Sequence, residues 1–245
     1  MLFKFQTLKG DQYMSTVQDR VDAPRLFITS DLHLGHKNII QYCNRPFDFT
    51  EQGIEESDDF LLAQYRDTVK ENDMVIFLGD LTFKKNHKGQ KMTEIITKLP
   101  GRKVLIKGNH DWYKDSFYRK CGFLSVNRYL IFGDYFLCHF PVTGKADFIN
   151  GRLMDEEYCK FVKATRGFIG EKTGFCTRII HGHTHTQRVD EDDGVTRYNC
   201  CVDYKPNHYA PVEFTKVKFP DLYTEVADYF QALESKQTEG KTKFF

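Results

Sequence analysis

Five short apolar runs in this chain each stop at side chains able to bind metal. They read "LFITSDLH", "DMVIFLGD", "VLIKGNHD", "YFLCH" and "IIHGHTH". Apolar runs of this length, bounded by polar residues, predict buried β-strands. Ligands of α/β proteins bind outside the carboxyl ends of the strands, so we expect the five strand ends to converge on one site.

The expected strand ends supply oxygen and nitrogen donors together. The candidate ligands are two aspartates, one asparagine and four histidines: Asp31, His33, Asp80, Asn109, His139, His183 and His185. This set is too large for one tetrahedral site and suits two ions that share a carboxylate, for which Asp80 is the candidate bridge. Mixed donors favour transition metals over magnesium or calcium. We therefore expect two divalent ions, manganese first, with iron, nickel or zinc as alternatives.

Helical and strand patterns alternate in the first half of the chain, and hairpins follow. Residues from Gly53 to Val69 carry apolar positions at helical spacing. The run "RYLIFGDYFLCHFP" predicts a hairpin that turns at Gly133 and Asp134. A helical stripe near the end is followed by a tail that we expect to fray. This order predicts an α/β fold with its sheets in the middle.

The length of 245 residues suits one domain. We divide it into an N-terminal arm (1–24), a body, an insert between two ligand strands (144–175) that could lie over the site, and a C-terminal helix and tail (219–245). The net charge of +1 provides no global field that recruits nucleic acid or membrane, although a local basic groove stays possible. The sequence leaves the oligomeric state undetermined, and an oligomer is possible.

The seven cysteines form no Cys-x-x-Cys pair and are odd in number, which favours reduced thiols. The first twenty residues lack the apolar core of a signal peptide. No apolar run approaches the roughly 18 residues of a membrane span. We therefore expect a cytoplasmic protein that does not enter a membrane.

The combined motifs "DLH", "GD", "GNHD", a lone histidine and "GHTH" resemble the calcineurin-like metallophosphoesterase superfamily, over about Arg25 to Phe214. The stretches "SDLHLGHKNIIQYCNRP", "GRKVLIKGNHD" and "VDYKPNHYAPVEF" are similar to a small subfamily found in bacteria and phages. The resemblance implies a four-layer α/β/β/α sandwich, in which two mixed β-sheets are flanked by helices.

The resemblance also implies a role for each matching residue. Asp31, His33 and His185 hold the first metal, Asp80 bridges, and Asn109, His139 and His183 complete the second. In the same resemblance, a metal-bridging hydroxide attacks the phosphorus. His110 touches the phosphate and protonates the leaving alkoxide, while Asp111 orients His110.

The implied reaction is hydrolysis of a phosphoester, and we favour a phosphodiesterase acting on a nucleotide-like or small phosphodiester. A phosphomonoesterase, a nuclease and a non-catalytic protein scaffold are the alternatives. A nuclease needs a basic track or an aromatic platform. The sequence offers only scattered candidates after "GNHD", namely Trp112, Tyr113, Lys114 and Arg119.

Two further residues are candidate substrate contacts. His36 follows the first ligands closely, but an ordinary loop histidine is an equal alternative. Arg45 could clamp an oxyanion with its planar guanidinium group, or it could fix its loop through a salt bridge.

Overall fold

The computed structural model describes residues 23–143, 148–149, 152–153, 156–170, 174–189 and 193–242. The expected N-terminal arm (1–24) lies almost entirely outside the described residues, and so do parts of the 144–175 insert. The elements follow the chain in this order: β1 (Leu26–Thr29), α2 (Ile39–Tyr42), α3 (Glu51–Thr68), β2 (Met74–Phe77), β3 (Asn86–His87), β4 (Gln90–Lys91), α4 (Met92–Thr97), β5 (Arg102–Ile106), α5 (Asp115–Lys120), β6 (Phe123–Asn127), β7 (Tyr129–Phe132), β8 (Tyr135–Cys138), β9 (Phe148–Ile149), β10 (Arg152–Leu153), α6 (Glu156–Thr165), η1 (Arg166–Phe168), β11 (Arg178–His181), β12 (Thr196–Asn199), η2 (Lys205–Asn207), β13 (Val212–Glu213) and α7 (Pro220–Thr242).

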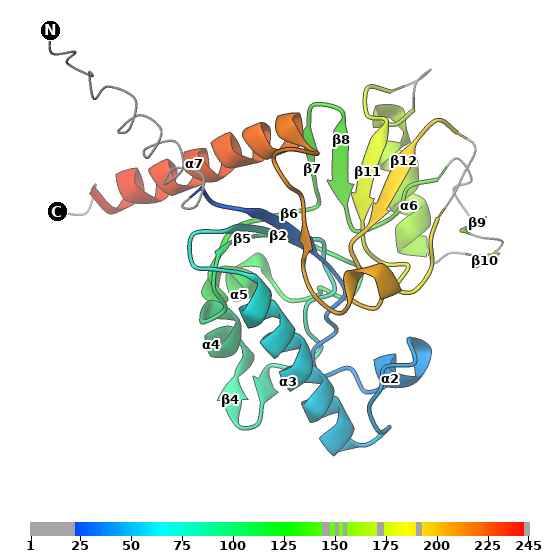
Figure 1. Cartoon of the computed structure of the whole chain (residues 1–245), viewed down its shortest axis with the longest axis vertical. Helices are drawn as coiled ribbons and strands as arrows, with labels where there is room; N and C mark the ends of the chain where they lie inside the picture. Colours follow the sequence, from blue (N-terminus) through cyan, green and yellow to red (C-terminus); the bar gives the residue numbers. More distant parts are fainter. Residues whose placement is uncertain are drawn as a thin grey trace, which may run out of the picture.

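Two mixed sheets form the centre of the molecule (Figure 1). The first has the order β13-β1-β2-β5-β6; β13 pairs antiparallel with β1, and the other neighbours are parallel. The second has the order β12-β11-β8-β7, in which β7 is the antiparallel member. Parallel strands leave their carboxyl ends on one edge of a sheet, so the ends of β1, β2 and β5 come together.

The two faces of each sheet bury different sets of side chains, because successive residues of a strand point to opposite sides. In β2, Val75 packs towards the helix layer of α3, α4 and α5, whereas Ile76 packs towards the second sheet. In β8, Leu137 faces the first sheet and Phe136 faces α6. The layers are therefore helices, sheet, sheet and helix, with α7 packed against the cluster between the sheets. The expected four-layer sandwich is confirmed.

Local sequence signals account for several boundaries. The hairpin of β7 and β8 turns at Gly133 and Asp134 as predicted. Helix α3 begins two residues earlier than expected, because the Thr50 side chain caps it by accepting a hydrogen bond from Gly53 N at 3.0 Å. Helix α7 continues to Thr242, so the expectation of a frayed tail is wrong for most of its length.

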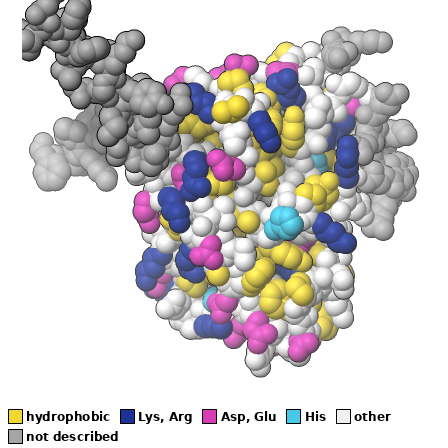
Figure 2. Space-filling view, in the orientation of Figure 1, with side chains coloured by type: hydrophobic (Ala, Val, Ile, Leu, Met, Phe, Trp, Pro, Cys, Tyr) yellow, Lys and Arg dark blue, Asp and Glu magenta, His cyan; other side chains and the backbone are white. Residues whose placement is uncertain are grey.

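The surface charges are mixed in sign and the cysteines are unpaired, as the sequence predicts. Lysine and arginine side chains are interspersed with acidic ones over the face shown in Figure 2. All seven cysteines are free, and six are buried. Among the described residues, no helix has the length and hydropathy needed to cross a membrane.

Candidate metal centre

Backbone hydrogen bonds join the loops that follow neighbouring strands in each sheet. Asp31 N donates to Gly79 O at 3.0 Å, and His33 N donates to Asp80 O at 2.9 Å, which joins the ends of β1 and β2. In the second sheet, Gly182 N donates to His139 O at 2.9 Å. The expected convergence of the strand ends therefore has a direct backbone cause.

Five of the candidate ligands have a left-handed backbone, which costs free energy for residues other than glycine. Their φ angles are 60° for Asp31, 49° for His33, 54° for Asp80, 68° for His183 and 48° for His185. Backbone strain of this kind persists where the surrounding structure enforces it, and it gathers at functional sites. Its concentration on these residues marks the loops as a site.

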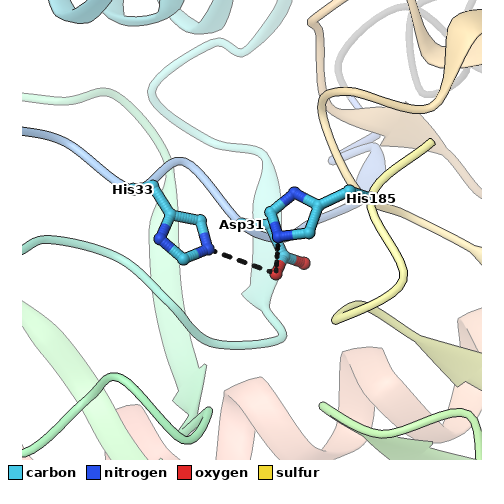
Figure 3. Close-up of side chains that lie close together, drawn as sticks. All are labelled: Asp31, His33 and His185. Carbon is cyan, nitrogen blue, oxygen red and sulfur yellow. Dashed lines mark ion pairs between the residues drawn. The ribbon is translucent and has the colours of Figure 1, made fainter. Parts of the chain in front are cut away.

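The first group of donors contains Asp31, His33 and His185 (Figure 3). Both histidine Nε2 atoms lie 3.7 Å from Asp31 Oδ1. His33 comes from the loop after β1, whereas His185 comes from the loop after β11 in the other sheet. The three ligand atoms therefore converge from two sheets, as the sequence predicts.

The second group gathers around His139. Its Nε2 atom lies 2.8 Å from Asn109 Oδ1, 3.3 Å from His183 Nδ1 and 3.5 Å from Asp80 Oδ2. The four side chains follow β2, β5, β8 and β11. The structure therefore brings the remaining candidate ligands together beside the first group.

Asp80 lies between the two groups. Its Oδ2 atom is 3.3 Å from His33 Nε2 and 3.5 Å from His139 Nε2, while its Oδ1 atom accepts a hydrogen bond from His110 N at 2.9 Å. One oxygen is thus fixed by the backbone, and the other faces both groups. Asp80 Oδ2 therefore faces a donor nitrogen of each group.

In His139 and His185, a hydrogen bond at Nδ1 determines which ring nitrogen is available to a metal ion. His139 Nδ1 lies 2.7 Å from Leu78 O, and His185 Nδ1 lies 2.9 Å from Asp203 Oδ2. Both partners can only accept, so Nδ1 carries the proton and Nε2 keeps its lone pair. Metal-binding histidines are held in this way by a carbonyl or a carboxylate.

The residues fit a cation in the first group. Asp31 Oδ1 and His33 Nε2 are buried and have no hydrogen-bond partner among the described residues. Buried polar atoms are rarely left unpaired. A positive ion between them satisfies both atoms, and the mixed donor chemistry of the site suits a transition metal.

Two glycines leave the space that the ligands need. A Cβ atom on Gly108 would lie 2.2 Å from Asp80 Oδ1 and 2.8 Å from His139 Nδ1. A Cβ atom on Gly182 would lie 2.5 Å from Asp31 Oδ2. The glycines of "GNHD" and "GHTH" are therefore explained by close packing against the candidate ligands.

Burial and the carboxylates shift the pKa values of the site histidines in opposite directions. Burial opposes protonation of His33, but the negative charges of the neighbouring Asp31 and Asp80 outweigh it and raise the pKa of His33 to about 9. Burial lowers the pKa of His183 to about 3. A histidine held as a neutral ring is ready to act as a ligand.

His110 lies beside the candidate donor groups, but Asp111 does not contact its ring. Asp111 accepts hydrogen bonds from Asp80 N at 2.7 Å and Gly108 N at 2.9 Å on one oxygen. Its other oxygen accepts from Leu81 N and Tyr118 Oη at 3.2 Å. His110 Nδ1 has no hydrogen-bond partner among the described residues. The buried carboxylate of Asp111 therefore holds the loops after β2 and β5, and the expected contact with the His110 ring is absent.

Arg45 does not reach a substrate site, so the salt-bridge alternative is correct. It is 3% exposed, and its guanidinium group donates to both carboxylate oxygens of Asp203 at 2.7 and 3.0 Å. It also donates to the carbonyls of Asp31 and Leu32 at 3.2 Å. Burial keeps this guanidinium group away from any ligand.

His36 remains a candidate substrate contact. It is half-buried, its ring stacks on Phe83 with centroids 4.0 Å apart, and its Nδ1 atom lies 3.3 Å from His33 Nδ1. The ring therefore borders the first donor group without belonging to it.

Asp203, which fixes His185, was missed in the sequence. It belongs to the stretch "VDYKPNHYAPVEF" and follows the end of β12 by four residues. An isolated aspartate after a strand whose other residues are polar gives little signal. Only the fold shows that Asp203 lies next to His185, a candidate ligand in the loop after β11.

The family model described as calcineurin-like phosphoesterase matches residues 24–154, slightly more than half of the chain. The chain belongs to the calcineurin-like phosphoesterase family. Membership implies metal-dependent hydrolysis of phosphoester bonds, and the converging donor groups agree with that chemistry.

Relatives of this chain occur in archaea, phages and bacteria. An uncharacterized protein of Methanocaldococcus jannaschii is 34% identical over 190 residues, which are 77% of this chain and 86% of the relative. The gene 66 protein of Mycobacterium phage L5 is 28% identical over 183 residues, 66% of this chain and 78% of its own length. A crystal structure of a protein of unknown function from Aquifex aeolicus is 27% identical with a TM-score of 0.56, covering 78% of this chain and 95% of that one.

Proposed function

We propose that this phosphoesterase uses two divalent ions to hydrolyse a nucleotide-like or small phosphodiester. The observation that supports two ions is the position of Asp80 Oδ2, which lies 3.3 Å from a donor nitrogen of one group and 3.5 Å from a donor nitrogen of the other. Manganese is the first choice, with iron, nickel and zinc as alternatives, because the donors combine carboxylate, amide and imidazole groups.

Bound ions supply Lewis acidity towards the phosphate oxygens and lower the pKa of an attacking water. In this proposal, Asp31, His33 and His185 hold one ion, Asn109, His139 and His183 hold the other, and Asp80 serves both. Leu78 and Asp203 keep two of the rings in the tautomer that leaves Nε2 free.

His110 is the proposed general acid for the leaving alkoxide. Its backbone N–H is tied to Asp80, so its ring starts from a fixed point beside the donor groups. The ring packs 4.9 Å from Phe83 and 5.5 Å from His33, centroid to centroid. In place of a carboxylate partner, these ring contacts orient His110, and its half-buried position leaves it open to a substrate.

The decisive assay compares a phosphodiester with a phosphomonoester. Purified protein is stripped of metal, reloaded with manganese, nickel, zinc or magnesium, and assayed on bis-p-nitrophenyl phosphate and p-nitrophenyl phosphate. The proposal predicts metal-dependent cleavage with a preference for the diester. Preference for the monoester identifies a phosphatase instead, and absence of cleavage together with absence of bound metal favours a scaffold.

A further inference from the structure

A cavity of about 460 Å³ adjoins the candidate metal centre and has no role in the reaction described above. It lies where β5 and β6 end, and Gly108, Asn109 and Asp111 form its wall towards the metal-binding groups. Asn109 therefore borders both the second donor group and the cavity. An ester held at that group can extend directly into this space, whose volume suits a small organic ligand.

The aromatic wall of the cavity is Trp112, the single tryptophan of the chain. Its side chain is 59% exposed. Phe83 and His110 meet it at nearly right angles, at 84° and 90°, with centroids 5.1 and 5.5 Å away. Two perpendicular neighbours fix the ring while more than half of its surface stays open for a ligand. The other aromatic candidate, Tyr113, packs against Phe117 and is not such a surface.

The polar groups of the cavity suit a hydrogen-bonding ring better than a second phosphate. Lys107 is already occupied, since its ammonium donates to Tyr113 O at 3.0 Å and lies 3.5 Å from Asp115. Arg128 is exposed and has no acidic partner among the described residues. Asn127 uses its amide NH₂ on Leu105 O and Ser125 Oγ, which leaves its carbonyl oxygen available. The cavity thus offers a donor on Arg128 and an acceptor on Asn127 beside its aromatic wall.

We propose that this cavity, the base pocket, holds the base of a nucleoside phosphodiester, with the base stacked on Trp112. This inference rests on the proposed function, because the metal centre has to hold the phosphate of the same substrate. Stacking on an aromatic side chain accepts any base, while Asn127 and Arg128 can contact its edge. The base pocket therefore favours substrates with a nucleoside over diesters with a small alkyl group.

The first test uses the fluorescence of Trp112, which is the chain's only tryptophan. The metal-loaded protein is titrated with adenosine 5′-monophosphate and with ribose 5-phosphate, and emission is excited beyond the tyrosine band. The base pocket predicts a saturable change with the nucleotide and none with the sugar phosphate. Identical responses to both ligands, or no response to either, overturn the proposal whether or not the protein hydrolyses diesters.

The second test is a ratio of kcat/KM values for two esters with the same leaving group, thymidine 5′-(p-nitrophenyl phosphate) and methyl p-nitrophenyl phosphate. The proposal predicts that the nucleoside ester is preferred. Trp112→Ala lowers this ratio about tenfold, as expected from losing one stacked base, while Trp112→Phe keeps most of it. Arg128→Ala, at the exposed rim, lowers it as well.

Phe175→Ala is the matched control. Phe175 is also 59% exposed, but it precedes β11 and so lies at the end of the sheet opposite the ligand loops. It should leave the ratio unchanged. A wild-type ratio near one, with both esters hydrolysed, rejects the base pocket and leaves the proposed function intact. Failure to cleave either ester counts against the proposed function, and the fluorescence titration then decides the base pocket alone.

Discussion

Arg45 and Asp203 form an ion pair inside the protein, 158 residues apart in sequence, with Nε 2.7 Å from Oδ1 and both side chains at most 1% exposed. The same carboxylate accepts a hydrogen bond from His185 Nδ1 at 2.9 Å. Arg45 also donates to the carbonyl of Asp31. The pair therefore supports two members of the first donor group at once, one from each sheet.

This relationship predicts that Asp203→Asn weakens metal binding. A neutral amide cannot serve Arg45 and His185 equally, and loss of such a supporting contact typically reduces metal affinity about 10–100-fold. Titration of stripped protein with manganese measures the change. Asp73→Asn is the matched control, since Asp73 pairs with Arg25 ahead of β1 and β2, at the opposite end of the sheet. Equal affinities for the two variants would contradict the role assigned to Asp203.

His110→Ala separates metal binding from catalysis. A positioned general acid contributes about 10²–10⁴-fold in rate, so we expect a fall of that size in kcat on a phosphodiester. His110 touches Asp80 only through its backbone N–H, which alanine keeps. Metal content, measured by elemental analysis, should therefore equal that of the wild type. Normal kcat with normal metal content would remove His110 from the mechanism.

Asp111 is expected to matter for the stability of the ligand loops. In Asp111→Asn, one oxygen that accepts two hydrogen bonds becomes an NH₂ group facing two donors, and each unsatisfied buried group costs about 1–3 kcal/mol. Tyr118→Phe removes a single hydrogen bond to the same carboxylate and should cost about 0.5–1.5 kcal/mol. Urea denaturation of metal-free protein compares them. Asp111 has no such role in the ligand loops if Asp111→Asn is no more destabilising than Tyr118→Phe.

The Arg25–Asp73 pair predicts a loss of stability in acid. Burial alone raises the pKa of Asp73, but hydrogen bonds from the Arg25 side chain and from the backbone N–H groups of Arg25 and Lys70 hold it below its usual value. A carboxyl with a lowered folded-state pKa stabilises the fold above the unfolded pKa of about 3.9, and this contribution is lost as pH falls through the folded pKa.

The measurement is the free energy of unfolding against pH for the wild type and Asp73→Asn. The variant should be less stable at neutral pH, and the two curves should converge in acid, because the protonated carboxyl no longer differs much from the amide. Parallel curves down to the lowest pH would show that Asp73 contributes no charge-dependent stability.

The strands and ligands could be predicted because they are local signals. Each apolar run predicts a buried strand, and the candidate ligand follows within a few residues of the strand in sequence. Asp80 follows Ile76 in this way, and His183 follows Ile180. The carboxyl ends of parallel strands meet by geometry, so the convergence of these residues follows without knowledge of the loops.

The supporting contacts could not be predicted because they join distant segments. Nothing near Arg45 in sequence indicates Asp203 as its partner. Asp111 lies next to His110, yet its oxygens bind backbone N–H groups that the loops after two strands bring to it. His87 stands in the polar stretch "KKNHKG", which predicts a solvated loop, but it is 8% exposed and lies 2.9 Å from Asp59 of α3.

Two ions are proposed to share Asp80, and anomalous diffraction from crystals loaded with manganese locates such ions without reference to activity. We predict two peaks about 3.5–4 Å apart, the usual spacing in two-metal sites, on either side of Asp80 Oδ2. One should lie against Asp31, His33 and His185, and the other against Asn109, His139 and His183. A single peak, or peaks away from Asp80, would contradict the two-metal centre.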